Sequence, residues 1–539
     1  MTEPTGRTPR RLWPPLWLRI LMAVPLLMIL WVRFGDVGGD RGIVNVNSAV
    51  LFVLTLLIGA PWFIFFSGYS RWWRFALPAA VLAAGALFFK VAHYRGVTGA
   101  MVPRFSLAGA PPALPMPGAP DAASPGARID LATTTPDDFP GFLGPDRSAE
   151  VGSARPGRDW RARAPEVVWR HPIGEGWSAF AVVNGYAVTM EQRGEDQAVT
   201  AYDARTGDLI WAHAIPGRFS HPLGGVGPRS TPTIDEGRVY ALGAQGRLVC
   251  LDGATGGAIW EVDLLAEYGV TPEQEFQNIQ YGRSNSALIV RDMVIVPAGG
   301  NKGGRIASLA AFDKRTGAKI WEAGERQISF ASPRLATLAG VEQILIVNED
   351  TVSGHDPATG RILWEHPWWG VTSAQASVSQ AVPVPPDRVF VSKGYGGGAA
   401  LIRLAPRDDG GLDAREVWKS PRVMRTKFTN VVIRNGHVYG LSDGTLECVR
   451  LETGERVWKQ GRYEHGQILG AGNLLLVLSE SGEVVLIEPT PGEPNKVLGR
   501  FQAVEGLTWN NLALYGDLLL VRNGREAAAW RLPLAGPPS

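Results

Sequence analysis

The sequence predicts an all-β fold, an eight-bladed β-propeller, preceded by an α-helical transmembrane anchor of three helices. Three observations carry this prediction: a turn pattern that recurs through the second part of the chain, an abundance of turn-forming and aromatic residues, and three apolar stretches near the N-terminus. The chain has 539 residues, among them 65 glycines, 40 prolines and 19 tryptophans. Many turn formers together with many tryptophans indicate numerous short strands joined by tight turns.

The net charge is only +2. Proteins that bind nucleic acid need a larger excess of Lys and Arg to neutralise phosphates. We therefore expect no nucleic-acid partner.

The anchor is expected in residues 1–95, with helices at about 13–32, 49–66 and 75–91. Each stretch approaches the roughly 20 residues that cross a hydrocarbon layer. The first stretch could instead be a cleaved signal peptide, but no small-residue cleavage site follows it. Three spans that stay in the lipid bilayer are the prediction.

The arginines indicate the orientation of the anchor. Three arginines precede residue 13, and Arg71 and Arg74 lie between the second and third spans, whereas the segment 33–48 balances two arginines with two aspartates. Cytoplasmic segments carry the excess of positive charge. We expect a multi-pass protein of the cytoplasmic membrane with its propeller on the periplasmic, extracytoplasmic side.

Residues 96–137 are rich in Pro, Ala and Gly and show no hydrophobic periodicity, which is typical of a linker. The propeller is expected in residues 138–535. A period of about 40 to 50 residues is typical of such repeat folds. Here the repeat is Asp-x-x-Thr-Gly-x-x-x-Trp, in which Asp initiates a turn, Gly supplies a positive φ and Trp opens the next strand. The copies are 203–211, 252–260, 313–321, 356–364 and, without the Asp, 450–458.

Two incomplete segments at the ends of the repeat region predict how the ring closes. The segment 528–532 ends a group of three strands, and 165–171 is a fourth strand that no group of three precedes. The eighth outer strand is expected near Val497 to Phe501. Pairing the two end segments would remove both sheet edges.

The repeated turn resembles the tryptophan-docking motif of pyrroloquinoline-quinone-like (PQQ-like, quinoprotein-type) propellers, over roughly residues 139 to 535. Phe139 to Arg147 also resembles the segment before the propeller in many members. The resemblance implies that each Trp stacks on a Gly of the neighbouring blade, with Trp169 and Trp418 matching the pattern less well. The implied structural residues are Gly207, Trp211, Gly256, Trp260, Gly317, Trp321, Gly360, Trp364, Gly454 and Trp458.

Quinoprotein dehydrogenases of this fold add an adjacent cysteine pair, an acidic base and a calcium ion to the propeller. This chain has only Cys250 and Cys448, in different blades, which we expect to be small buried strand residues. No histidine stands at a spacing typical of zinc ligands. We expect no catalytic residue, no metal and no cofactor; PQQ with calcium belongs to the alternative function alone.

Polar and aromatic residues recur where each innermost strand begins, and in register they would surround one mouth of the central tunnel. The candidates are Trp177, Arg229, Arg283, Asn285, Gln375, Lys427, Asn430, His465, Trp509 and Asn510. Arg229, Arg283 and Lys427 would attract an anionic ligand there, unless nearby acids such as Glu275 or Glu464 neutralise them. The other possibility is that these residues only bond inner-strand backbone and water.

The predicted function is a non-catalytic binding or scaffold module at the membrane, whose partners are envelope proteins or polymers. The alternative is a PQQ-dependent dehydrogenase, which only the fold favours. A sensor that signals through the helices is a third possibility.

Overall fold

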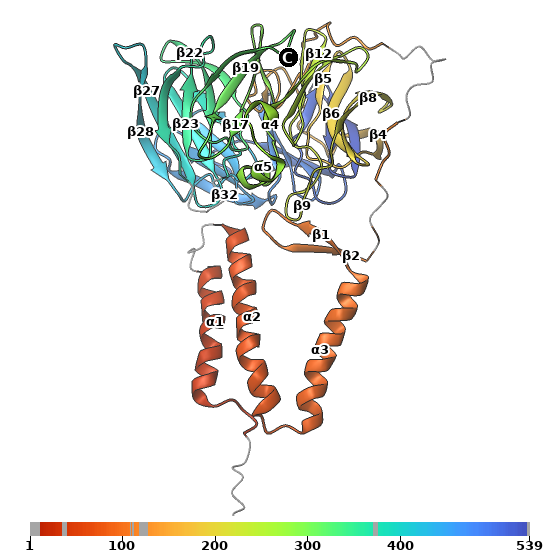
Figure 1. The fold of residues 1–539 in the computed structure, drawn as a ribbon, viewed down its shortest axis with the longest axis vertical. Helices are drawn as coiled ribbons and strands as arrows, with labels where there is room; N and C mark the ends of the chain where they lie inside the picture. Colours follow the sequence, from red (N-terminus) through yellow and green to blue (C-terminus); the bar gives the residue numbers. More distant parts are fainter. Residues whose placement is uncertain are drawn as a thin grey trace, which may run out of the picture. The chain divides into compact units, whose positions relative to one another are not determined.

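The computed structural model describes residues 11–34, 40–107, 109, 113–117, 128–369 and 376–535. The chain divides into two compact units, Met1–Pro111 and Pro112–Ser539. The first unit contains helices and one hairpin, and the second contains the propeller (Figure 1).

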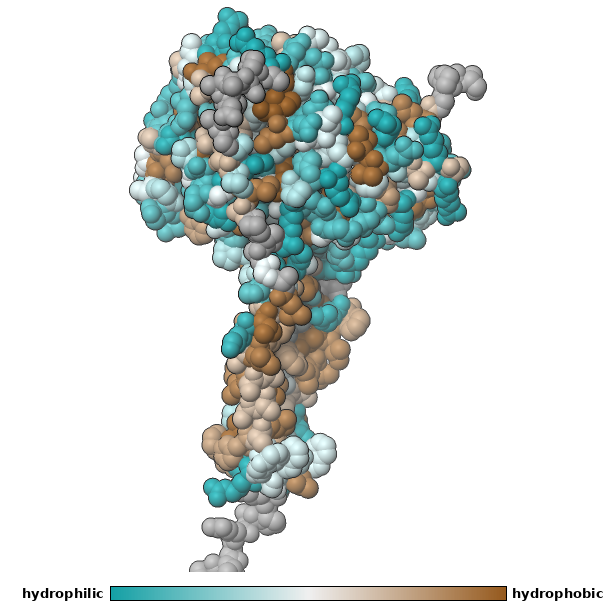
Figure 2. All heavy atoms as spheres, turned by 90° about the vertical axis from the view of Figure 1, so that its right-hand side faces the viewer, coloured by the Kyte–Doolittle hydropathy of each residue, from teal (hydrophilic) through white to brown (hydrophobic). Residues whose placement is uncertain are grey.

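Three long apolar helices form the first unit, as predicted. They are α1 (Leu16–Phe34), α2 (Arg41–Phe65) and α3 (Arg71–Val91), and each is long and apolar enough to cross a membrane. Figure 2 shows hydrophobic residues gathered over them. α2 begins before the apolar stretch because Asp40 caps it, accepting hydrogen bonds from the backbone amides of Gly42 and Ile43.

The segment expected as a linker, 96–137, has structure at both of its ends. At its start, β1 (His93–Val97) and β2 (Pro103–Ser106) form an antiparallel hairpin. Near its end, Ile129 and Leu131 are buried in the propeller core. The sequence did not predict these short elements, because the segment is rich in Pro and because a two-stranded hairpin is too short to show a clear hydrophobic periodicity.

Among the described residues of the second unit, the strands form eight blades of four antiparallel strands, which confirms the predicted fold class. Blade one contains β5 (Ala181–Val183), β6 (Tyr186–Arg193), β7 (Asp196–Asp203) and β8 (Leu209–Pro216). Blade two contains β11 (Thr233–Asp235), β12 (Arg238–Leu242), β13 (Arg247–Asp252) and β14 (Ala258–Asp263). Blade three contains β15 (Leu288–Val290), β16 (Met293–Val296), β19 (Leu309–Asp313) and β20 (Lys319–Ala323). Blade four contains β21 (Arg334–Leu338), β22 (Val341–Val347), β23 (Thr351–His355) and β24 (Ile362–Pro367).

The remaining blades follow the same order. Blade five contains β25 (Val382–Val384), β26 (Arg388–Lys393), β27 (Gly398–Pro406) and β28 (Leu412–Ser420). Blade six contains β29 (Val431–Arg434), β30 (His437–Ser442), β31 (Thr445–Arg450) and β32 (Arg456–Arg462). Blade seven contains β33 (Gln467–Ala471), β34 (Leu474–Leu478), β35 (Glu483–Glu488) and β36 (Lys496–Gln502). Blade eight contains β37 (Ala513–Tyr515), β38 (Leu518–Arg522), β39 (Glu526–Arg531) and β4 (Glu166–Pro172).

Blade eight closes the ring with strands from both ends of the repeat region. β39 pairs with β4 in antiparallel register, from Glu526 opposite Pro172 to Arg531 opposite Glu166. The closure is therefore as predicted. The hydrophobic core lies between blades: one cluster joins blades one and two, for example, and another joins blades two and three.

Short insertions decorate blades one to three. They are the hairpin of β9 (Ser220–His221) and β10 (Gly225–Val226), the helices α4 (Leu264–Glu267) and α5 (Pro272–Asn278), and the hairpin of β17 (Gly299–Gly300) and β18 (Ile306–Ala307). A capping box at Thr271 and Gln274 begins α5. The insertions add side chains that are not part of the repeat, such as His221 in β9 and Glu275 in α5.

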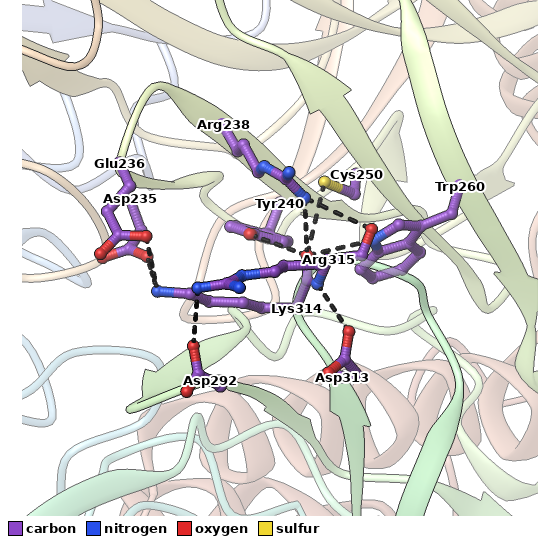
Figure 3. A network of polar contacts seen from close by, with 10 residues as sticks. All are labelled: Asp235, Glu236, Arg238, Tyr240, Cys250, Trp260, Asp292, Asp313, Lys314 and Arg315. Carbon is purple, nitrogen blue, oxygen red and sulfur yellow. Dashed lines mark hydrogen bonds and ion pairs between the residues drawn. The ribbon is translucent and has the colours of Figure 1, made fainter.

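Tryptophans dock on glycines of the next blade at five seams. At each seam the ring lies so close that a Cβ on the glycine would meet it, at 2.7 Å for Trp211 on Gly256. The pairs are Trp169 with Gly207, Trp211 with Gly256, Trp260 with Gly317, Trp321 with Gly360 and Trp418 with Gly454. At the seam between blades two and three, the carbonyl of Lys314 accepts from Trp260 Nε1 (3.1 Å) and Tyr240 Oη (3.0 Å) (Figure 3).

Two tryptophans differ from the expectation. Trp364 lies against Gly354 of its own blade and donates to Gln343 Oε1 at 2.5 Å. The reason is that the turn between β27 and β28, which faces it in the next blade, lacks the Thr-Gly motif. Trp458 reaches the next blade through a hydrogen bond to the carbonyl of Thr490 (3.2 Å), where the motif glycine is also missing.

A buried ionic cluster joins blade eight to blade one. Glu191 is fully buried, accepts from Tyr202 Oη at 2.6 Å, and lies 3.3 Å from Arg193 Nε. Arg522 of blade eight is equally buried and donates to the carbonyls of Met190 (2.9 Å) and Gly174 (2.8 Å). Burial lowers the pKa of Arg522, and the nearby Glu191 opposes this. The cluster thus links blades eight and one at the place where the ring closes.

The segment before the propeller, 139–160, crosses one end of the tunnel. The backbone amide of Phe139 donates to the carbonyl of Val182 in blade one (2.8 Å). The carbonyl of Pro140 accepts from the amide of Ile234 in blade two (2.8 Å). Farther on, β3 (Glu150–Val151) pairs in parallel with β33 of blade seven.

Arg147 is the most deeply inserted polar residue of this segment. Its guanidinium donates to the carbonyls of Ser286 (3.1 Å), Ala287 and Pro333 (2.9 Å), in blades three and four. It is 6% exposed, and burial together with the neighbouring Arg334 lowers its pKa. The segment therefore lies across the tunnel at the end formed by the turns between the first two strands of each blade.

Candidate functional site

The described candidate residues lie at the opposite end of the blades, near the starts of the inner strands. Contacts between neighbouring blades connect this rim. Asn510 of blade eight donates to the carbonyl of Ser178 in blade one (2.7 Å), and Gln467 of blade seven donates to those of Phe428 (2.9 Å) and Trp509 (2.8 Å). Asn285 of blade three donates to the carbonyl of Ala331 (2.6 Å) in blade four. These bonds bring together residues that lie near the starts of the inner strands of neighbouring blades.

Just inside the rim, side-chain oxygens accept hydrogen bonds from backbone amides of the preceding blade. The bonds run from Ala179 to Thr231 Oγ1 (3.2 Å), from Thr231 to Ser286 Oγ (2.9 Å), from Ser286 to Ser332 Oγ (2.9 Å) and from Gln380 to Asn430 Oδ1 (2.9 Å). A buried backbone amide needs such a partner. These polar residues, Asn430 among them, thus have a structural task that positions the inner strands.

The three expected cations do not form an open positive cluster. Arg283 is 1% exposed and its Nε lies 2.6 Å from Glu275 Oε1, which α5 supplies. Arg229 donates to the carbonyl of Gly227 (3.0 Å) and lies over the Phe219 ring at 5.1 Å. Burial lowers its pKa, although an arginine stays charged at neutral pH.

Lys427 and His465 are also enclosed. Lys427 is 4% exposed, with its Nζ 5.6 Å from the Tyr395 ring centroid. His465 is 3% exposed, and its Nε2 lies 3.9 Å from Asp443 Oδ1. Of the three cations that we expected at the tunnel mouth, Arg283 and Lys427 are therefore buried and Arg229 is partly buried. Gln375 lies outside the described residues.

Aromatic rings, rather than cations, form the accessible part of the rim. Trp177 and Trp509 lie 4.7 Å apart between centroids, and Phe428 continues the row at 5.1 Å from Trp509. All three are partly exposed. Trp509 Nε1 donates to Glu480 Oε1 at 2.6 Å, which fixes the indole. We call Trp177, Trp509 and Phe428 the aromatic row.

A second group of rings lies over blades two to four. Tyr281 and Phe330 are 5.8 Å apart, and His221 lies 4.7 Å from Tyr281. Trp177 Nε1 (2.7 Å) and Arg229 Nη2 (2.5 Å) both donate to the carbonyl of Gly224, in the hairpin that also carries His221. Sequence reasoning missed Phe428, Tyr281 and Phe330. The available signal was their position a few residues before an inner strand, as for Trp177 and Trp509.

A surface pocket of about 330 Å³ lies elsewhere, where the segment before the propeller passes blades eight and one. Asp137, Arg155, Arg205, Tyr515 and Asp517 contribute to its walls. Its walls contain two aspartates and two arginines, so the pocket has no dominant charge. It supplies no set of converging groups that would define a ligand.

Both cysteines are buried strand residues, as expected. Cys250 and Cys448 are 0% exposed and unpaired. Burial raises the pKa of both thiols, for Cys448 to about 11. Within the described residues, no group of three or more His, Cys, Asp or Glu side chains is arranged to hold a metal ion.

Comparison with known proteins supports the fold. A family model described as outer membrane protein assembly factor BamB matches residues 162–275 and 195–460. The quinone-dependent alcohol dehydrogenase, dehydrogenase subunit, of Gluconacetobacter polyoxogenes is 30% identical over 130 residues, which is 22% of this chain and 16% of that protein. The chain thus matches about a sixth of the length of this relative.

Two solved structures share the architecture. A europium-containing methanol dehydrogenase aligns with a TM-score of 0.51 at 12% identity, over 74% of this chain and 98% of that one. The quinohemoprotein alcohol dehydrogenase of Comamonas testosteroni aligns with a TM-score of 0.50 at 14% identity, over 76% of this chain and 82% of that one. At these identities the likeness concerns the fold alone.

Proposed function

We propose, since this chain belongs to the PQQ-like repeat family described as outer membrane protein assembly factor BamB, that it is a non-catalytic, membrane-anchored binding module. The observation that carries the proposal is the aromatic row at the tunnel mouth. Interface hot spots are enriched in Trp, Tyr and Arg, and hydrogen bonds to Glu480 and to the Gly224 carbonyl hold the two indoles of the row in place. Its partner would be an envelope protein or an envelope polymer.

The polar groups of the mouth support binding rather than chemistry. Asn285, Asn430 and Asn510 bond the backbone that leads into the inner strands, and Arg283 is paired with Glu275. A reaction needs a base or nucleophile that can reach a substrate. Arg283 and Lys427 of the mouth are instead buried, and Arg229 donates to the backbone carbonyls of Gly227 and Gly224.

The alternative, a PQQ-dependent dehydrogenase, would require residues that fit the quinone and its calcium ion. Calcium takes six to eight oxygen ligands, several of them carboxylates. Among the described residues no such set converges, and the two cysteines lie in blades two and six. The residues therefore do not fit this cofactor, and we derive no reaction through it.

Photo-crosslinking tests the binding proposal. A photoreactive phenylalanine analogue at Phe428 or Trp509 is expected to give discrete adducts in intact cells, because both side chains are partly exposed at the mouth. Val417, 42% exposed on an outer strand, is the matched control position. Trp509→Ala should weaken capture of the same partner by about thirtyfold, the effect of losing one hot spot. Identical adducts from Val417 would contradict the proposal.

We further propose that the propeller lies on the extracytoplasmic side of the cytoplasmic membrane. The arginines of the N-terminal tail and of the segment 66–74 support this, whereas Lys90, Arg95 and Arg104 would lie on the other side and oppose it. A reporter that is active only outside the cytoplasm should work after Ser539 and fail at Ser70. The reverse pattern would invert the orientation.

A further inference from the structure

The hairpin β1–β2 connects the ends of two membrane helices. α3 ends at Val91 and β1 begins at His93. At the far end of the hairpin, Asn45 Nδ2 of α2 donates to the carbonyl of Ala100 at 2.8 Å. The hairpin therefore reaches from the last turn of α3 to the first turns of α2 (Figure 1).

These two attachment points lie at the same depth. α2 and α3 are antiparallel, and from Asn45 to Phe65 and from Arg71 to Val91 each helix rises roughly 30 Å. This is about the thickness of a hydrocarbon core. A hairpin that joins two points at this level must run along the membrane surface.

Aromatic side chains cluster where the hairpin meets α3. Phe105 lies 5.0 Å from Phe88 and 5.9 Å from Tyr94, between ring centroids. Tyr94 is 47% exposed and Phe105 40%, so much of the cluster is uncovered by the rest of the protein. Tyr, like Trp, is enriched at the headgroup level of membranes, where its polar hydroxyl can stay hydrated while its ring lies against apolar groups.

The charges on the hairpin itself have one sign, although Asp40 caps the nearby start of α2. From Arg41 to Pro120 the sequence contains no acidic residue, whereas Lys90, Arg95 and Arg104 lie in or next to the hairpin. Each Lys or Arg near an anionic membrane surface attracts it with about 1 kcal/mol, which is a factor of about five in binding. The hairpin thus combines an aromatic cluster with cations.

We propose that the hairpin β1–β2 is a lipid-binding element that lies in the headgroup layer and prefers anionic phospholipids. This proposal concerns the anchor and does not depend on what the propeller binds. The partner is the bilayer surface itself, with phosphate as the group that the cations contact. The helices alone would hold the chain in the membrane, so the hairpin adds selectivity for lipid composition.

A depth measurement tests where the hairpin lies. Cys250 and Cys448 are 0% exposed, so a cysteine in place of Val102, which is 47% exposed, should take a fluorescent label alone. The full chain is placed in phosphatidylcholine vesicles that contain a nitroxide on the lipid headgroup. The label at Val102 should shift to the blue and lose most of its fluorescence, whereas a label at Asp408, an exposed turn of the propeller, should respond to aqueous iodide instead. Equal iodide quenching at both positions would overturn the proposal.

Two double variants separate the aromatic and ionic contributions. The variant Tyr94→Ser with Phe105→Ser should expose the Val102 label to water, so that the label loses its blue shift and becomes accessible to iodide. Arg95→Gln with Arg104→Gln should keep its depth but reduce, by up to about fivefold per cation, its preferential quenching by nitroxide-labelled phosphatidylglycerol over phosphatidylcholine. The matched control is Arg315→Gln with Arg415→Gln, at exposed cations of the propeller. An unchanged preference in the hairpin variant would refute the anionic selectivity.

Discussion

Glu191→Gln is expected to destabilise the propeller by about 3–5 kcal/mol, the usual cost of removing one partner from a buried ion pair. Glu191 is the carboxylate of the cluster that joins blade eight to blade one, and Arg193 and Arg522 are its cations. Without it, two buried guanidinium groups would remain without a neighbouring carboxylate. Unfolding in urea, followed by circular dichroism, measures the loss.

The matched control is Glu342→Gln. Glu342 pairs with Arg291 across the seam between blades three and four, but the two side chains are 41% and 59% exposed. Exposed pairs contribute at most about 1 kcal/mol, so this variant should unfold almost like the parent. If Glu191→Gln costs no more than Glu342→Gln, the ionic cluster does not stabilise the closing seam.

The blade architecture could be predicted because its information is local. Each Asp-x-x-Thr-Gly turn contains the groups that form it: Asp252 accepts from the amides of Ala254 and Thr255, for example, and Gly256 has a φ of +73°. A repeat of such turns fixes strand order and blade number without knowledge of the tertiary contacts. The seam partner of Trp364 could not be predicted in this way, because it depends on a turn of another blade that lacks the motif.

The sequence could not predict that the cations at the mouth are neutralised or buried, because the ion pair of Arg283 depends on the inserted helix α5. Glu275 precedes Arg283 by a few residues, yet only the helix α5 turns its carboxylate back toward the guanidinium. The positions of the candidates followed from strand register, whereas their exposure followed from side-chain packing between blades. For this reason Trp177 and Trp509 remain accessible and Lys427 does not.

The role of the segment before the propeller was also invisible in the sequence. Phe139 to Arg147 has no hydrophobic periodicity that would mark a strand or a helix. Its contacts reach residues as far as 186 positions away, as between Arg147 and Pro333. Long-range contacts of a single irregular segment leave no repeated pattern, so only its resemblance to other family members marked it.

Arg147→Ala is expected to destabilise the chain by about 2–4 kcal/mol. The substitution removes the donors to the carbonyls of Ser286, Ala287 and Pro333, and an unsatisfied buried acceptor costs about 1–3 kcal/mol. The substitution also removes the repulsion between Arg147 and the nearby Arg334, and this offsets part of the loss. Arg147→Lys should fall between the variant and the parent, because one ammonium cannot reproduce the planar fork of a guanidinium.

Limited proteolysis gives this prediction a second, local measurement. When Arg147 no longer fastens the segment 139–160 to blades three and four, cleavage within that segment should accelerate before the blades themselves are cut. Arg155→Ala is the matched control, because the Arg155 side chain is exposed and, among the described residues, donates to the carbonyls of Gly152 and Ala154 in its own segment. It should change stability by less than about 0.5 kcal/mol. If both variants are cleaved at the same rate, the β3 pairing and not Arg147 holds the segment across the tunnel.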